Sequence, residues 1–281
     1  MKAVVGIDGS KYGEWALEWL AKLPFRTVPN VVGVHGLDLQ SEPAPFLTHP
    51  SITGLEPDAG EAAHFLESRA QRVVEETKKR LKQLGLKGAV RVVQDAIANA
   101  LLKHAGNKGL LVVGSRGLNA LDRFMLGSVS TAVTLHAACP VLVVKEAPKP
   151  VRRILFATDG SSASEKARQF LIKQFKIKAA AEPVVILLVH VMPFFRYTVV
   201  KDAGETLLAQ ETAKLEKAGY RVREFPRVGP AGEEIMKLVG REQPDLIVIG
   251  AKGRNAVTRF LQGSVSIKVV QQSDCSVLVV R

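Results

Sequence analysis

The hydrophobic positions of this chain fall into short apolar runs, separated by stretches in which apolar residues recur every three or four positions. The runs at 4–10, 31–35, 110–114 and 139–145 have the length of buried strands, and the amphipathic stretch 12–23 is typical of a helix. Strands that are apolar throughout and alternate with helices predict a parallel sheet covered on both faces, a doubly wound α/β unit.

Each apolar run of the first half has a counterpart in the second half. The pairs are 4–10 with 154–161, 31–35 with 184–190, 110–114 with 246–250, and 139–145 with 275–281. Repetition in the same order indicates a duplicated unit. We therefore expect two tandem domains, residues 1–146 and 147–281. The short, proline-containing linker 146–150 leaves them little freedom to separate, so we expect them to pack together.

A glycine-punctuated stretch follows the fourth strand of each unit. Residues 114–130 read GSRGLNALDRFMLGSVS and residues 250–266 read GAKGRNAVTRFLQGSVS, identical at ten of the seventeen positions. Ligands of open parallel sheets bind where the strands end. Glycines let backbone N–H groups form a nest for phosphate oxygens, and the helix that follows adds unpaired N–H donors. The stretch therefore suits a mononucleotide with several phosphates.

Asp8 and Asp159 end the first strand of each unit, at the same edge of the sheet, where a carboxylate can accept hydrogen bonds from a ribose or a base. The alternative is purely structural. Asp-Gly-Ser is a common turn, Ser10 is placed to cap the helix after it, and Ser-Val-Ser at a helix start can serve as an N-cap. His35 and His190 close equivalent strands, and we expect both to be buried with a hydrogen-bond partner.

Taken together, these motifs resemble two tandem universal stress protein domains across essentially the whole chain. The ATP-binding branch of that family carries Gly-x2-Gly-x9-Gly-(Ser/Thr), which both stretches match. The resemblance implies a Rossmann-like, adenine nucleotide α-hydrolase-like fold. It also implies that the last strands, 141–144 and 277–280, pair to form an intramolecular pseudo-dimer. ATP, with or without Mg²⁺, is the implied cofactor.

The resemblance further implies which residues contact the nucleotide. Aspartates would contact adenosine, backbone after the second strand would lie beside adenine, and the glycine loops and following serines would hold the phosphates. The implied contacts are Asp8, Gly36, Gly114, Gly117, Gly127, Ser128, Val129 and Ser130 in the first unit, and Asp159, Val191, Gly250, Gly253, Gly263, Ser264, Val265 and Ser266 in the second.

The surroundings of the two stretches differ. The second unit keeps the family pattern at 227–235 and 243–250, whereas the first unit departs from it and carries a Pro- and Gly-rich insertion at 38–60. The second site is therefore expected to be the more regular one. Basic residues occupy equivalent places in both stretches and could face phosphate or solvent; they are Arg116, Arg123, Lys252 and Arg259.

The net charge of +12 raises the question of nucleic acid. The lysines and arginines follow helices without interleaved aromatic residues or a recognition-helix signature, so nucleic-acid binding is disfavoured. No apolar stretch is long enough for a membrane span, and the N-terminus has no signal-peptide pattern, so we expect a cytoplasmic protein. Cys139 and Cys275 occupy equivalent places and suggest no disulfide.

We identify no catalytic residue and no metal-ligand spacing. The leading hypothesis is an ATP-binding stress-response protein that acts as a nucleotide-dependent binding or regulatory module. A slow ATP-hydrolysing enzyme and a protein-interaction scaffold without nucleotide are the alternatives. The sequence does not identify the protein partner, a further homo-oligomer, or whether both sites fill.

Overall fold

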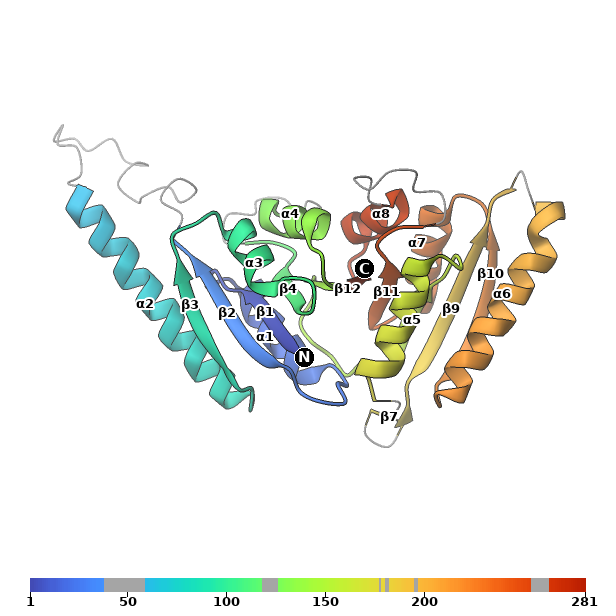
Figure 1. Ribbon diagram of the computed structural model, residues 1–281, viewed down its shortest axis with the longest axis horizontal. Helices are drawn as coiled ribbons and strands as arrows, with labels where there is room; N and C mark the ends of the chain where they lie inside the picture. The colour runs from blue at the N-terminus through green and yellow to red at the C-terminus, as the bar shows by residue number, and fades with distance from the viewer. Residues whose placement is uncertain (38–58, 118–125, 177, 180–181, 195–196, 254–262) are drawn as a thin grey trace.

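The computed structural model describes residues 1–37, 59–117, 126–176, 178–179, 182–194, 197–253 and 263–281. Within these residues the strands and helices alternate as the apolar runs predict (Figure 1). The first half contains β1 Lys2–Gly6, α1 Lys11–Lys22, β2 Asn30–Gly36, α2 Ala59–Gln83, β3 Gly88–Val93, α3 Ile97–Ala105, β4 Leu110–Gly114, α4 Ser128–His136 and β5 Val141–Val144. The second contains β6 Arg153–Ala157, α5 Ser162–Gln174, β7 Lys178–Ala179, β8 Glu182–Pro183, β9 Val185–Met192, α6 Tyr197–Lys217, β10 Arg221–Val228, α7 Ala231–Glu242, β11 Leu246–Gly250, α8 Ser264–Gln272 and β12 Val277–Val280.

All the strands except the small hairpin β7–β8 form one sheet, in the order β10-β9-β6-β11-β12-β5-β4-β1-β2-β3. Neighbouring strands within each half run parallel. At the centre, β5 and β12 pair antiparallel, with Leu142 opposite Leu278. The pairing of the last strands is thus confirmed, and the two repeats share a single sheet.

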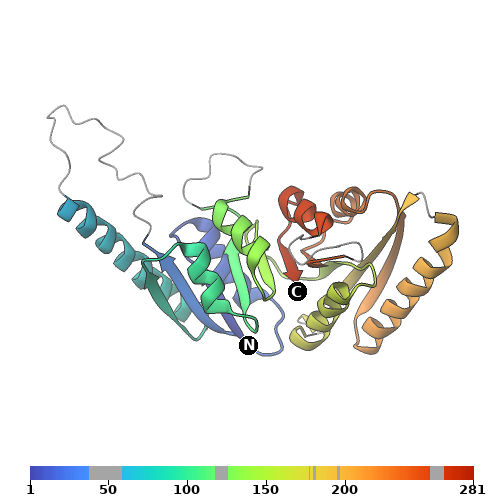
Figure 2. The ribbon, with the colours of Figure 1, turned by 45° about the horizontal axis from the view of Figure 1, so that its top comes forward.

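Helices cover both faces of this sheet. The buried side chains of α1, α2, α5 and α6 pack on one face, and those of α3, α4, α7 and α8 pack on the other. Figures 1 and 2 show α4 and α8 side by side above the central strands. The doubly wound α/β architecture expected from the sequence is therefore present in each half.

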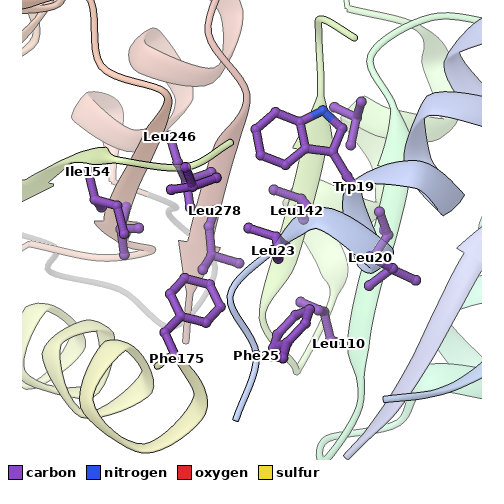
Figure 3. Packing of buried hydrophobic residues seen from close by; sticks show 14 of the residues in the cluster. Trp19, Leu20, Leu23, Phe25, Leu110, Leu142, Ile154, Phe175, Leu246 and Leu278 are labelled. Atoms are coloured by element: carbon purple, nitrogen blue, oxygen red, sulfur yellow. The ribbon is translucent and has the colours of Figure 1, made fainter. Parts of the chain in front are cut away.

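The boundary between the halves is closed by aromatic side chains as well as by the central strands. Trp19 is fully buried, and its Nε1 donates to the carbonyl of Glu146, 2.9 Å away. Phe25 and Phe175 form an isolated antiparallel bridge with their ring centroids 5.3 Å apart. Figure 3 shows these rings beside Leu142 and Leu278. The expectation that the halves pack together is confirmed by a continuous apolar core.

Two local features differ from the sequence-based reading. Helix α2 begins at Ala59, inside the Pro- and Gly-rich insertion 38–60, whose composition does not indicate a helix. Residues 38–58 of that insertion lie outside the described residues. The hairpin β7–β8 carries no sequence signal that we used. Among the helices that the structure describes, none has the length and apolarity of a membrane span.

Candidate functional site

The first glycine of each loop lets the strand end press against the neighbouring helix. A Cβ on Gly114 would lie 2.6 Å from the Cβ of Tyr12, in the first turn of α1. A Cβ on Gly250 would lie 2.7 Å from the carbonyl carbon of Ala163 in α5. A real Cβ does not tolerate such distances to backbone, so glycine is needed here for packing. The pattern thus has a structural purpose at this position, whatever the loop binds.

The second glycine of each loop faces the aspartate predicted to contact a nucleotide. A Cβ on Gly117 would lie 2.9 Å from Oδ2 of Asp8, and one on Gly253 would lie 2.7 Å from Oδ2 of Asp159. The other carboxylate oxygen is used locally: Oδ1 of Asp8 accepts from the N–H of Ser10 at 2.9 Å. The turn therefore orients the carboxylate toward the loop, and the equivalent bond recurs at Asp159. The structure brings the two motifs together in both halves.

The third glycine and the second serine after it lock the end of each loop. The N–H of Gly127 donates to the carbonyl of Ser115 at 2.8 Å, and the Ser130 hydroxyl donates to the same carbonyl at 3.1 Å. The hydroxyl of Ser266 does the same to the carbonyl of Ala251 at 3.0 Å. Both serine side chains are buried. Their hydroxyls hold the loop rather than face solvent. The sequence pattern alone does not distinguish this role from contact with a ligand.

The first serine of each helix lies differently. Helices α4 and α8 begin at Ser128 and Ser264, as predicted, and both residues are exposed. Val129 and Val265 are partly buried behind them. The leading N–H groups of an α-helix have no acceptor within the helix, and its dipole favours a negative charge there. Each loop therefore ends at an exposed hydroxyl beside several backbone donors.

The residues expected beside adenine lie at the ends of the second strands. Gly36 ends β2, and a Cβ there would lie 3.1 Å from the Cβ of Ile97, so α3 approaches closely. Val191 lies near the end of β9 and is half-buried. Both nearby histidines have the expected hydrogen-bond partner: Nδ1 of His35 lies 2.8 Å from the carbonyl of Ile7, and Nδ1 of His190 lies 2.9 Å from that of Thr158. His35 is buried as expected, whereas His190 is only half-buried.

The basic residues of the loops are only partly described. Arg123 and Arg259 lie outside the described residues. Nη1 of Arg116 lies 3.4 Å from the hydroxyl of Tyr12, and its guanidinium stands over that ring at 5.9 Å. In the second half, the carbonyl of Lys252 accepts from Oγ of Ser161 at 3.2 Å. Tyr12 and Ser161 were not predicted to contact the loops; their place in the first turn of α1 and at the start of α5 was the available signal.

The arrangement offers a carboxylate, a glycine loop and a helix N-terminus at one edge of the sheet in each half. Within the described parts of the chain, no group of three or more His, Cys, Asp or Glu side chains is placed to hold a metal ion. The loop and the helix N-terminus offer backbone donors to an anionic ligand, and the carboxylate offers acceptors to hydroxyl groups of that ligand.

Comparison with known proteins gives a consistent picture. The model of the universal stress protein family matches residues 1–145 and again 150–281. A universal stress protein of Mycolicibacterium smegmatis is 30% identical over 295 aligned residues, covering 99% of this chain and 96% of the relative. The crystal structure of a universal stress protein from Archaeoglobus fulgidus shares the fold, with a TM-score of 0.71 at 19% identity, covering 100% of this chain and 98% of that one.

A further solved structure is a universal stress protein family protein from Arabidopsis thaliana with AMP bound. It covers 46% of this chain and 90% of that chain, with 20% identity and a TM-score of 0.34. The match to the family model covers both halves of this chain, and the M. smegmatis relative spans nearly all of it. The chain therefore belongs to the universal stress protein family, with two tandem domains of that family in one chain.

Proposed function

We propose that this protein binds ATP at the end of each parallel half-sheet and acts as a nucleotide-dependent binding or regulatory module. The observation that carries the proposal is the contact between the second loop glycine and the aspartate, which occurs at Gly117–Asp8 and again at Gly253–Asp159. An aspartate oriented by its own turn and facing a glycine loop supports adenosine on one side and phosphates on the other. The domains of the proposal are residues 1–146 and 147–281.

In this proposal the polyphosphate lies along the glycine loop and reaches the start of α4 or α8. The exposed hydroxyls of Ser128 and Ser264 donate to the outer phosphates, together with the leading N–H groups of the helices. The carboxylates of Asp8 and Asp159 accept from the adenosine hydroxyls. Backbone at Gly36 or Val191 borders the base. Mg²⁺, where it takes part, arrives with the phosphates, because hard cations bind phosphate oxygens.

Binding rather than turnover is proposed because the observed geometry, an oriented carboxylate facing a glycine loop, accounts for holding a nucleotide. Rapid phosphoryl transfer relies on a residue that orients the nucleophile and on cations that neutralise the transferred group. A slow ATPase remains the second candidate and rests on the loop geometry alone. The cytoplasmic location expected from the sequence is part of the same hypothesis.

The test is isothermal titration calorimetry with ATP on the full chain and on loop variants. We expect two ATP molecules per chain with affinities on the order of micromolar. Gly117→Ala and Gly253→Ala place a methyl group against Asp8 or Asp159 and displace the carboxylate, so each should reduce the stoichiometry to one. The matched control is Gly240→Ala in α7, where an added Cβ meets nothing within 4 Å.

Three results would contradict the proposal. Absence of heat with any adenine nucleotide, together with an unchanged melting temperature, favours a scaffold without nucleotide. Equal loss in the Gly240→Ala control shows that the effect is not local to the loops. Steady release of phosphate that stops in the Gly117→Ala and Gly253→Ala variants favours an enzyme instead.

A further inference from the structure

Three arginines surround one aromatic ring at an edge of the sheet. The guanidinium carbons of Arg223, Arg227 and Arg241 lie 5.2, 5.9 and 5.6 Å from the ring centroid of Phe225. Phe225 is only 8% exposed. We call these three arginines and the ring that they cover the arginine platform. A cation over an aromatic face is attracted to it, and Phe225 thus holds the three side chains together.

The platform has more positive than negative charge. Glu242 contacts two of its members, with Oε2 3.2 Å from Nη1 of Arg223 and Oε1 3.1 Å from Nε of Arg241. Among the residues that the structure describes, no carboxylate lies within ion-pair distance of Arg227. The side chains of Arg223 and Arg241 remain 57% and 56% exposed. One carboxylate therefore pairs with only two of the three guanidinium groups, and a second anion would relieve the mutual repulsion of the three.

The strand sets the spacing of these charges. Strand β10 is the last in the sheet order, so one of its sides has no neighbouring strand. Arg223, Phe225 and Arg227 are alternate residues and point to the same face. Arg223 and Arg227 are four residues apart, or about 13 Å at the rise of a strand. An extended peptide has the same rise, so acidic side chains at alternate positions would match this row.

The first half has no such platform. His35 lies opposite Val92 in the sheet, and its counterpart His190 lies opposite Pro226. This register aligns β3 with β10, so Ala89, Arg91 and Val93 stand where the second half has Arg223, Phe225 and Arg227. The fold of the family does not require the platform, because the other copy of the fold forms β3 without it.

We propose that the arginine platform docks an extended acidic segment of a partner protein, whose carboxylates pair with Arg223, Arg227 and Arg241. Guanidinium groups bind carboxylates through parallel N–H bonds, which favours this partner chemistry. Nucleic acid fits less well, because binding of single strands relies on aromatic faces open for stacking, and the Phe225 ring is covered. The proposal is independent of nucleotide binding. Arg227 lies in register with Val191, so the docked segment would end beside the loop edge of β9.

The test uses fluorescence anisotropy with a labelled peptide of alternating glutamate and serine at low salt, on the full chain. The double variant Arg223→Gln/Arg241→Gln should weaken binding about tenfold, since exposed ion pairs each contribute up to about 1 kcal/mol. Arg227→Gln should weaken it by a smaller factor. The control Lys79→Gln/Arg91→Gln removes the same charge from exposed sites of the first half and should leave affinity unchanged within about twofold.

Circular dichroism and melting temperature confirm that the variants fold, and Arg223→Lys/Arg241→Lys supplies a charge-preserving variant with intermediate affinity. Equal weakening in the Lys79→Gln/Arg91→Gln control overturns the proposal, because it shows attraction by net charge alone. Absence of peptide binding at low salt also overturns it. An oligonucleotide that binds the same arginines more tightly than the peptide overturns it in favour of nucleic acid.

Discussion

The two halves of the molecule fill equivalent positions beneath their helices with different chemistry. Aligned by their N-cap serines and by the glycines after α2 and α6, Leu17 corresponds to Arg168 and Thr77 to Glu211. In the second half, Arg168 and Glu211 form a buried ion pair, extended by Lys214 at 3.0 Å from Glu211. A groove of about 430 Å³ opens over that pair. The same backbone therefore accommodates either buried Leu17 and Thr77 or a buried ion pair at these equivalent positions.

The loops are anchored differently as well. In the first half, the side chain of Arg116 is held against Tyr12. In the second half, Ala163 stands where Tyr12 does, and backbone at Lys252 is held by Ser161 instead. The comparison shows which features the site geometry needs. The glycines, the aspartate and the buried serine recur in both halves, whereas the anchoring side chains vary.

The largest difference between the halves is expected in the stability lost when Trp19, the aromatic residue at their boundary, or its equivalent is replaced. Trp19→Ala should lower the free energy of unfolding by about 3–5 kcal/mol, because it leaves a cavity and removes the hydrogen-bond donor of the Glu146 carbonyl. The equivalent residue is Phe170, which is only partly buried. Phe170→Ala should therefore cost less. Urea denaturation followed by circular dichroism measures both, and equal losses would contradict this reading of the boundary.

A second experiment replaces residues of the second half with those at the equivalent positions of the first half. Glu211→Ala should lower the free energy of unfolding by about 3 kcal/mol, because Arg168 is left as a buried charge with only exposed Glu165 nearby. The double variant Arg168→Leu/Glu211→Thr installs the residues of the first half. It should stay within about 1 kcal/mol of the native protein, since replacing both partners removes the unpaired charge. A double variant as unstable as Glu211→Ala would show that the ion pair is indispensable here.

A smaller and equal effect is expected at the buried serines. Ser130→Ala and Ser266→Ala each remove a hydroxyl that donates to carbonyls of the loop and of the preceding glycine. Each should cost about 1 kcal/mol of unfolding free energy. Ser128→Ala and Ser264→Ala, at exposed positions, serve as matched controls and should change it by less than about 0.5 kcal/mol. Thermal denaturation measures the loss of stability in each variant. A larger loss in Ser128→Ala than in Ser130→Ala would contradict the structural role assigned to Ser130.

The last expected effect depends on pH and concerns a lysine between the halves. Burial lowers the pKa of Lys145 to about 8. Between that pH and the ordinary lysine value of about 10.4, the unfolded chain binds more protons than the folded one, so stability rises with pH. The melting temperature of the native protein relative to Lys145→Met should therefore rise from about pH 7 to about pH 9.5. A constant difference would show that burial does not disfavour the charged amine.

The sequence predicts much of this structure because its signals are local. Apolar runs identify the strands, and Gly-Ser-Val-Ser marks the start of α4 and α8. The resemblance to universal stress proteins implies that the two last strands meet. The contact between each loop and its aspartate also follows, since both lie at strand ends on one edge of a parallel sheet.

Other features depend on tertiary register, which no local pattern contains. The arginine platform combines β10 with α7, and its arginines look like ordinary solvated residues in the sequence. The start of α2 at Ala59 carries no local signal, because it lies inside the Pro- and Gly-rich insertion 38–60. The sequence alone does not show whether the hydroxyls of Ser130 and Ser266 contact a ligand or hold the loop, because their acceptors lie in another segment of the chain.

The short connection between β5 and β6 has a consequence for how the halves could change over time. In a symmetric dimer of identical chains, any substitution at the interface occurs in both subunits. The new side chain must therefore be compatible with its own copy across the two-fold axis. Here each half always meets the other at a high effective concentration, whatever the amount of protein. Trp19 and Phe170 can therefore differ, as can Leu17 and Arg168, without either half losing its partner. Fusion frees one copy to acquire new surface chemistry while the other remains unchanged.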